Sequence, residues 1–287
     1  FPAQPTTSLS KYPEKTRHIP SLARSMSSAG YPTYYYYGGD ATFANKQTFL
    51  LNTGFERVIT LKDFGKATET SKWGVPDGVL FERALYDAQA DTASSAFRVI
   101  QTLSSHEPFE VPYHNPAFAS DEACNAFAYT DSCATAFIDR LAASPRWDRT
   151  LVILVPDHYG CYPHNPDPAD VILRHRIPLI MTGGALAMRG PIDTPASQVD
   201  ITATLLDAMG IDRSEYQFSR NFLDPAVKPF AFMSTPTYTA TVDSNGVSSV
   251  YNIETRLFNT GTEHPVTHAD SINAAYLQTL YDTLNDI

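Results

Sequence analysis

The chain has 287 residues, 43% of them hydrophobic, which is enough to bury a sizeable core as one large domain or as a domain with an appendage. Its formal net charge is -10 and its Lys and Arg residues form no block, so binding to nucleic acid or directly to anionic lipid is disfavoured. No stretch approaches the about 18 continuous apolar residues of a membrane-spanning helix, and the first residues lack the basic and apolar regions of a signal peptide. The chain as given is therefore expected to be soluble.

Segments with helical and strand-like patterns alternate along the first part of the chain. Hydrophobic spacing and turn residues predict helices over residues 20–29, 77–90, 123–141 and 197–209. Apolar, β-prone runs predict strands over residues 31–37, 97–103, 151–156 and 177–182, and the run 151–156 is expected to be buried. Because strands that alternate with helices usually form parallel sheets, the pattern predicts an α/β fold with a mainly parallel sheet.

The pattern changes near residue 216. Short β-like pieces follow at residues 230–233, 238–242 and 247–253, and Ser244-Asn245-Gly246 between the last two is typical of a hairpin turn. A final helix is predicted over residues 270–284. We therefore expect one domain over residues 1–215 and a small antiparallel β subdomain with a closing helix over residues 216–287.

The pair Asp157-His158 directly follows the apolar run 151–156. Ligands of α/β sheets gather at the carboxyl ends of the strands, so both side chains stand where chemistry is usually performed. A carboxylate beside an imidazole can bind one divalent cation such as Mn²⁺, Mg²⁺ or Zn²⁺. The alternative is an Asp that caps the next helix beside a packed His.

Three other residues invite a structural and a functional interpretation. His106 follows the predicted strand 97–103, which places it on a loop at the same sheet edge, although it could simply bond to backbone there. Asp40 follows two glycines and either orients a substrate or caps a turn. Trp73 is interpreted as a core aromatic residue.

The remaining histidines and the cysteines give no metal-binding pattern. His264 and His268 have helical ligand spacing, but Pro265 lies between them and a solvated helix start is favoured. The three cysteines have no metal-ligand spacing, and their odd number rules out complete pairing within the chain.

A series of short segments, in their order and spacing, resembles the alkaline phosphatase/sulfatase superfamily, and within it the sulfatase-like branch that includes lipoteichoic acid synthases. The segments cover most of the chain: IPSL at 19–22 with GY at 30–31, YGGDATFAN at 37–45, KWGVPD at 72–77, TLSSHEPF at 102–109, YTD at 129–131, DH at 157–158, RIPLI at 176–180 and QVDI at 198–201. The resemblance implies an alkaline phosphatase-like three-layer sandwich with a mainly parallel sheet and a small C-terminal antiparallel β subdomain.

The same resemblance implies a metal-dependent sulfatase-like hydrolase or phosphotransferase. Its substrate would be a phosphate or sulfate ester of an envelope lipid or glycan, on the extracytoplasmic side of the membrane. In that branch the nucleophilic Thr and the first metal carboxylate lie upstream of the segment matching residues 1–8, and Thr6, Thr7 and Ser8 match a linking loop. We therefore expect this chain to lack its nucleophile, to be inactive alone, and to reach a membrane only through a missing N-terminal anchor.

Site roles carry over residue by residue. Asp157 and His158 match metal ligands for one divalent ion (Mn, Mg or Zn), which an incomplete ligand set would hold weakly. His106 matches a residue of the substrate pocket, where it can bond a phosphoryl oxygen or protonate a leaving alkoxide. The substrate-binding candidates are Asp40, Asn45 and Lys46.

One departure from the family concerns the substrate. Lipoteichoic acid synthases carry Trp where this chain has Ala44 and Arg where it has Lys46, and a Lys keeps the charge but loses the planar bidentate fork. We therefore expect a wider pocket and a substrate other than the polyglycerol-phosphate precursor. Two alternatives stay open: a noncatalytic sulfatase-like binding module, and a two-metal phosphatase or phosphodiesterase of the same superfamily. The latter would need further ligands, for which His164, His175, His264 and His268 are the available histidines.

Overall fold

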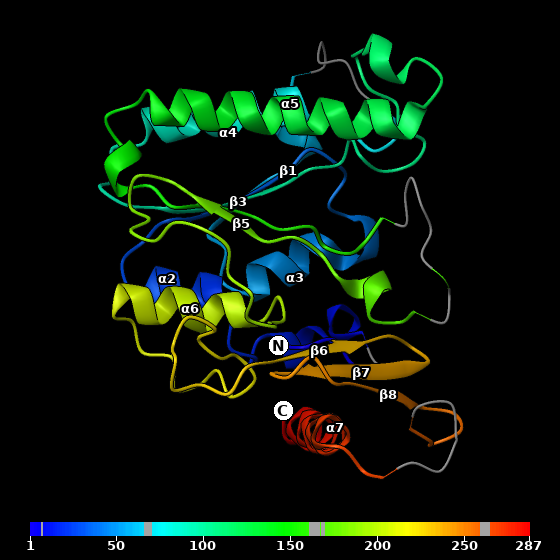
Figure 1. Ribbon diagram of the computed structural model, residues 1–287. Coiled ribbons are helices and arrows are strands. Elements are labelled where there is room, and N and C mark those ends of the chain that lie inside the picture. Colours follow the sequence, from blue (N-terminus) through cyan, green and yellow to red (C-terminus); the bar gives the residue numbers. More distant parts are fainter. Residues whose placement is uncertain (7, 66–70, 161–166, 168–169, 259–264) are drawn as a thin grey trace. The chain divides into compact units, whose positions relative to one another are not determined.

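The computed structural model describes residues 1–6, 8–65, 71–160, 167, 170–258 and 265–287 (Figure 1). The chain divides into two compact units. Unit 1 comprises Phe1–Ser25, Asn165–Arg176 and Gly190–Ile287, and unit 2 comprises Met26–His164 and Ile177–Arg189. His164 and His264 of the two-metal alternative, as well as Thr7 and Cys161, lie outside the described residues.

Unit 2 is built on a parallel three-stranded sheet in the order β2-β1-β3. Its strands are β1 (Thr33–Tyr37), β2 (Arg57–Ile59) and β3 (Phe97–Gln101). Helices α4 (Asp77–Ala90) and α5 (Glu122–Ala142) cover one face, whereas α3 (Lys46–Asn52) lies on the other (Figure 1). The expected parallel sheet with helices is thus present, and its carboxyl edge is formed by the ends of β1 and β3.

The four tyrosines of β1 show how this sheet is packed. Tyr36 is fully buried and belongs to a core cluster with Ile59 of β2 and Leu80 of α4. Successive side chains of a strand point to opposite faces, so Tyr35 and Tyr37 project from the face that α3 covers. The sequence therefore places two phenol rings beside the first residue of α3.

A separate antiparallel pair follows in the same unit, formed by β4 (Val152–Leu154) and β5 (Ile180–Thr182). The expectation of a buried strand over residues 151–156 is wrong in extent and in burial. The strand is three residues long and half-buried, and the flanking Leu151 and Val155 are exposed. Within the described residues β4 pairs only with β5, so one of its edges has no strand beside it.

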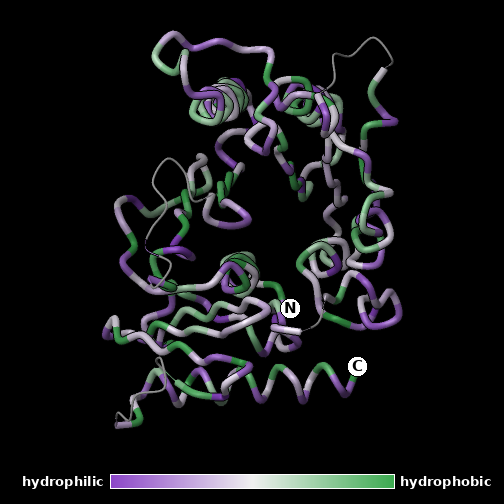
Figure 2. Tube along the Cα trace, turned by 90° about the vertical axis from the view of Figure 1, so that its right-hand side faces the viewer, coloured by the Kyte–Doolittle hydropathy of each residue, from purple (hydrophilic) through white to green (hydrophobic). Residues whose placement is uncertain are grey.

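Unit 1 contains an antiparallel sheet in the order β6-β7-β8. Its elements are β6 (Phe230–Ser234), β7 (Tyr238–Asp243), β8 (Ser248–Asn252), α6 (Asp200–Met209) and α7 (His268–Asp286). Hydrophilic and hydrophobic residues alternate along α7, the helix that ends at the label C, because one side packs on β7 and β8 (Figure 2). His268 is exposed at the start of α7, as the sequence predicts.

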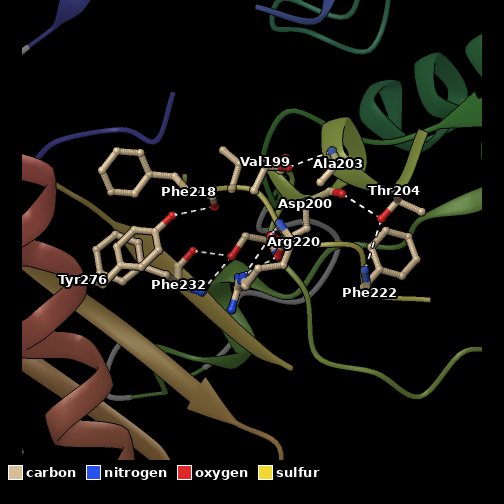
Figure 3. A network of polar contacts seen from close by, with 11 residues as sticks. Val199, Asp200, Ala203, Thr204, Phe218, Arg220, Phe222, Phe232 and Tyr276 are labelled. Carbon is tan, nitrogen blue, oxygen red and sulfur yellow. Dashed lines mark hydrogen bonds and ion pairs between the residues drawn. The ribbon is translucent and has the colours of Figure 1, made fainter. Parts of the chain in front are cut away.

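A buried ion pair ties α6 to the segment before β6 (Figure 3). Arg220 donates from Nη2 to Asp200 Oδ2 at 2.8 Å, and its backbone N–H donates to Oδ1 at 2.9 Å. The backbone N–H of Ser197 donates to the same carboxylate at 2.8 Å. Burial raises the pKa of Asp200, while the Arg220 guanidinium opposes that rise. This satisfied carboxylate is a structural part of unit 1.

Shorter elements complete the chain. The helices α1 (Pro13–Thr16) and α2 (Leu22–Ser28) precede β1. One-turn 3-10 helices occur at Leu9–Lys11, Phe43–Asn45, Leu61–Asp63, Pro116–Phe118, Trp147–Arg149 and Leu173–His175. The short α3 and β2 were not predicted from the sequence, because seven and three residues are too few to show a period.

Candidate functional site

The candidate site residues all belong to unit 2. Tyr37 ends β1 and Gln101 ends β3, and the two are register partners in the parallel sheet. His106 follows β3 by a few residues, and Asp157 follows β4. Polar side chains thus gather at strand ends, where α/β sheets usually bind ligands.

The loop after β3 is fixed by a buried carboxylate. Asp77, the fully buried first residue of α4, accepts hydrogen bonds from the backbone N–H groups of Leu103 at 2.8 Å and Ser104 at 3.2 Å. Its second oxygen accepts from the Thr130 hydroxyl of α5 at 2.6 Å. The Ser104 hydroxyl in turn accepts from the Asp77 backbone N–H at 2.9 Å. In this network, Asp77 of the KWGVPD segment and Thr130 of the YTD segment anchor the loop that carries His106.

His106 is exposed on that loop and is oriented by two contacts. Its Nδ1 lies 2.9 Å from the carbonyl oxygen of Glu107, and its ring lies 4.7 Å from that of Trp73. In the neutral ring, a proton on Nδ1 that donates to the carbonyl leaves Nε2 with a lone pair that can take up a second proton. Trp73 is half-buried rather than a core residue, and its indole N–H donates to the same carbonyl, so the core interpretation of Trp73 is wrong. The ring supports His106 instead.

Glycines allow this loop system to approach the end of β1. The carbonyl of Gly38 accepts from the Val75 backbone N–H at 3.0 Å. Gly74 has a φ of 137°, and a Cβ on it would lie 2.1 Å from the Gly38 carbonyl oxygen. A side chain at either contact would push the segment that carries Trp73 away from β1.

Asp157 and His158 lie together after β4 and are both exposed. Asp157 Oδ2 and His158 Nε2 are 3.9 Å apart, and His158 Nδ1 lies 3.0 Å from the carbonyl oxygen of Tyr159. That contact favours the tautomer with its proton on Nδ1, which leaves Nε2 free to bind a metal. Two ligands each about 2.1 Å from one ion can be at most about 4.2 Å apart, so the pair fits a shared ion. The described residues contain no group of three or more His, Cys, Asp or Glu side chains placed to hold a metal.

A cationic corner lies on the α3 face of the sheet. Lys46, the first residue of α3, donates from Nζ to Gln101 Oε1 at 3.0 Å, and its Nζ lies 3.9 Å from the ring centroid of Tyr37. The Tyr35 hydroxyl donates to the same Gln101 oxygen at 2.7 Å. We call these four residues, Lys46, Gln101, Tyr35 and Tyr37, the lysine corner.

The negative charge of Asp157 contributes to the pKa values of two residues of the lysine corner, Lys46 and Tyr35. Burial lowers the pKa of Lys46, and the negative charge of Asp157 opposes that effect. Burial raises the pKa of Tyr35, and the charges of Tyr37 and Asp157 add to the rise. The carboxylate after β4 and the ammonium at the start of α3 therefore share one electrostatic environment.

The loop between β1 and α3 presents the remaining candidates. Asp40 Oδ1 accepts from the Thr42 backbone N–H at 2.9 Å and from its hydroxyl at 2.7 Å, and these bonds lower the pKa of Asp40. Asp40 thus caps a turn, while its role toward a substrate stays a prediction. Asn45 is exposed, and both it and Ala44 have left-handed backbones, with φ of 56° and 53°. Such strain in residues other than glycine is common at functional loops.

Several functional candidates were missed in the sequence. Gln101, Tyr35 and Tyr37 were not predicted from the sequence as site residues. Their positions near the carboxyl ends of two predicted strands could have indicated a place in a ligand site. Thr6 and Ser8 are exposed, and among the described residues their hydroxyls contact the hydroxyls of Tyr281 and Ser10 and no histidine or carboxylate. Within the described residues, Cys124 and Cys133 are free cysteines, and no helix is long and apolar enough to span a membrane.

Known proteins resemble this chain in sequence. A family model described as Sulfatase matches residues 1–211. The lipoteichoic acid synthase-like protein YvgJ of Bacillus subtilis is 22% identical over 237 residues, which cover 74% of this chain and 38% of that protein. Phosphoglycerol transferase I of Xanthomonas axonopodis pv. citri is 27% identical over 231 residues, which cover 73% of this chain and 32% of that protein. The chain thus spans less than two fifths of the length of either relative.

Solved structures resemble it in fold. A protein in the alkaline phosphatase superfamily from Vibrio parahaemolyticus has a TM-score of 0.76 and 24% identity, over 99% of this chain and 73% of that one. The lipoteichoic acid synthase LtaP from Listeria monocytogenes also has a TM-score of 0.76, with 20% identity over 100% of this chain and 78% of that one. The expected alkaline phosphatase-like fold is confirmed.

Proposed function

Because this chain belongs to the sulfatase family, we propose that its full-length protein is a metal-dependent hydrolase or phosphotransferase. The substrate is a phosphate or sulfate ester of an envelope lipid or glycan, and the reaction takes place outside the cytoplasm. Two relatives that carry the names of a lipoteichoic acid synthase-like protein and a phosphoglycerol transferase support transfer of a phosphorylated group. Because the chain covers only 38% and 32% of their lengths, the activity is proposed for the full-length protein.

One observation carries this proposal: Asp157 Oδ2 and His158 Nε2 are 3.9 Å apart, a separation that one shared divalent ion allows. The ammonium of Lys46, the first residue of α3 in the same unit, is a cation that can bind an oxyanion. Lys46 has no carboxylate within ion-pair distance among the described residues. The cation thus remains available to an anionic ligand.

The chain's own residues suggest a division of labour. Asp157 and His158 would hold one divalent ion, and that ion would supply Lewis-acid chemistry for the ester and the nucleophile. Lys46 binds a nonbridging oxygen of the ester as a point charge. Asn45 and Asp40 border the same loop and contact the remainder of the substrate. His106, protonated on both ring nitrogens, gives its Nε2 proton to the leaving alkoxide while Nδ1 stays bonded to the Glu107 carbonyl.

The test is turnover by the purified full-length protein on a panel of phosphate and sulfate esters, with Mn²⁺, Mg²⁺ or Zn²⁺ added in turn. Asp157→Asn and His106→Gln should each lower kcat/KM about 100-fold or more, because each removes a group that acts on the reacting atoms. Asp131→Asn and His114→Gln change exposed residues of the same types and should have no effect.

Two other results would replace the proposal. Binding of metal and ester without turnover would favour the noncatalytic module. Two equivalents of metal, both needed for turnover, would favour the two-metal enzyme of the same superfamily. A clear preference for phosphatidylglycerol with glycerol-phosphate transfer would contradict the expectation drawn from Ala44 and Lys46 that the substrate differs from that of lipoteichoic acid synthases.

A further inference from the structure

The hydrogen-bond partners of the Gln101 side chain determine which of its two amide atoms is the oxygen and which is the nitrogen. One of its two polar atoms lies 3.0 Å from Lys46 Nζ and 2.7 Å from the Tyr35 hydroxyl oxygen. An ammonium has three donors and no acceptor, so the atom that faces it must be the amide oxygen. The amide nitrogen, Nε2, therefore has a defined position on the other branch of the same planar group.

Gln101 Nε2 has no hydrogen-bond partner among the described residues. The residue is half-buried, and Nε2 is not one of the fully buried polar atoms without a partner. Since Nε2 has no partner, it must be accessible to solvent. The nitrogen and oxygen of one amide are only about 2.2 Å apart. Two N–H groups are thus presented beside the lysine ammonium, at the carboxyl edge of the parallel sheet.

Lys46 alone offers little geometric selectivity. Its Nζ gives one hydrogen bond to Gln101 and lies over the Tyr37 ring, and the rest of its donor capacity is unused in the described part of the chain. An ammonium on a flexible stem binds an anion as a point charge, without the parallel donors of a guanidinium. A second donor held at a fixed distance from Nζ supplies that missing geometry.

We propose that Gln101 is a specificity-determining residue that donates from Nε2 to one nonbridging oxygen of a phosphate or sulfate ester while Lys46 donates to another. This inference rests on the proposed function, in which Lys46 binds the ester. Gln101 has two roles: its Oε1 accepts a hydrogen bond from the Lys46 ammonium and positions it, and its Nε2 donates to the oxyanion. Tyr35 keeps the amide from turning, since its hydroxyl occupies the second lone pair of the oxygen.

The experiment uses the 287-residue chain, labelled with ¹⁵N, and two separate probes, inorganic phosphate and inorganic sulfate. The side-chain NH₂ resonances of Gln101, identified by their absence from a Gln101→Glu spectrum, should shift as either anion is added. The anion that binds more tightly indicates the ester class. Resonances that stay unchanged at saturating anion would overturn the inference without reference to any variant.

Affinity measurements on variants separate the two roles. Gln101→Leu should bind the anions about tenfold more weakly, because a hydrogen bond to a charged group is lost. Gln101→Glu keeps an oxygen toward Lys46 and Tyr35 but removes the donor and adds a negative charge, so it should bind even more weakly. Gln89→Leu, an exposed position on α4, is the matched control and should bind as the unmodified chain does.

Failure of this inference can be told from failure of the proposed function. If Lys46→Met loses anion binding while Gln101→Leu and Gln101→Glu bind within twofold of the unmodified chain, Gln101 has no part in recognition and the anion site stands. If Lys46→Met also binds normally, both ideas fail. Circular dichroism at the temperature of each titration checks that every variant is folded.

Discussion

The two ends of the candidate site are held in different ways. Lys46 is half-buried, hydrogen-bonded to Gln101 and placed over the Tyr37 ring, all on one sheet face. Asp157 and His158 have side chains that are 81% and 74% exposed. Asp157 Oδ1 accepts from the His158 backbone N–H at 3.0 Å, and His158 Nδ1 lies 3.0 Å from the Tyr159 carbonyl oxygen, so these contacts are between neighbours in sequence. The proposed oxyanion end is thus preorganised by the sheet, whereas the proposed metal end can gain order when an ion binds.

The largest expected effect comes from breaking the support of the loop that carries His106. Asp77→Ala leaves the backbone N–H groups of Leu103 and Ser104 and the Thr130 hydroxyl without their acceptor. We expect the free energy of unfolding to fall by about 3 kcal/mol in urea denaturation, because each unsatisfied buried donor costs about 1 kcal/mol or more. Asp131→Ala, on the exposed side of α5, should change it by less than about 0.5 kcal/mol. A loss below about 1 kcal/mol for Asp77→Ala would show that the loop is held by other contacts.

Substitutions at Asp157 and His158 should have the opposite result: metal binding changes, and the free energy of unfolding does not. Isothermal titration of this chain with Mn²⁺ or Zn²⁺ should give one weak site, far below the about 10 to 16 kcal/mol of structural zinc sites, because two ligands replace three or four. Asp157→Ala or His158→Ala should abolish it and leave the free energy of unfolding within about 0.5 kcal/mol. Tight binding that survives both substitutions would place the metal elsewhere.

The two ends can be tested for their electrostatic coupling. Asp157→Ala removes the negative charge that opposes the effect of burial on Lys46, so the pKa of Lys46 should fall further. The ¹³Cε chemical shift of Lys46 in an NMR titration reports this pKa directly. The matched substitution Asp131→Ala should leave the pKa of Lys46 unchanged. An unchanged pKa in Asp157→Ala would mean that the two ends act independently.

The smallest effect is expected from Tyr35→Phe, which removes one of the two donors to Gln101. The pKa of Tyr35 in the folded chain is raised above its unfolded value, so the stability it lends is complete below about pH 10 and is lost as the pH rises toward the folded pKa. Urea denaturation between pH 8 and 11 should therefore show a shallower alkaline decline for the variant, and a loss of about 1 kcal/mol at neutral pH. An identical decline in both proteins would contradict this.

The sequence predicted the long helices and strands, because hydrophobic periodicity is a local signal. Strand-end position made Asp157 and His158 candidate metal ligands, and that role stays a prediction. The role of Asp77 could not be predicted, since its partners Ser104 and Thr130 are 27 and 53 positions away. Gln101 was missed for the same reason: its meaning depends on Lys46, 55 positions earlier. The antiparallel β5 differs from the parallel expectation because direction within a sheet depends on tertiary pairing.

The left-handed backbone at Ala44 restricts how this site can change over evolutionary time. At a φ of 53° a β-branched residue is strongly disfavoured, so Val, Ile and Thr are poor replacements for Ala44. The adjacent Phe43 has an ordinary backbone, and its side chain is 68% exposed, so it can vary at little cost to the fold. Within this loop, position 43 therefore tolerates a wider range of side chains than position 44.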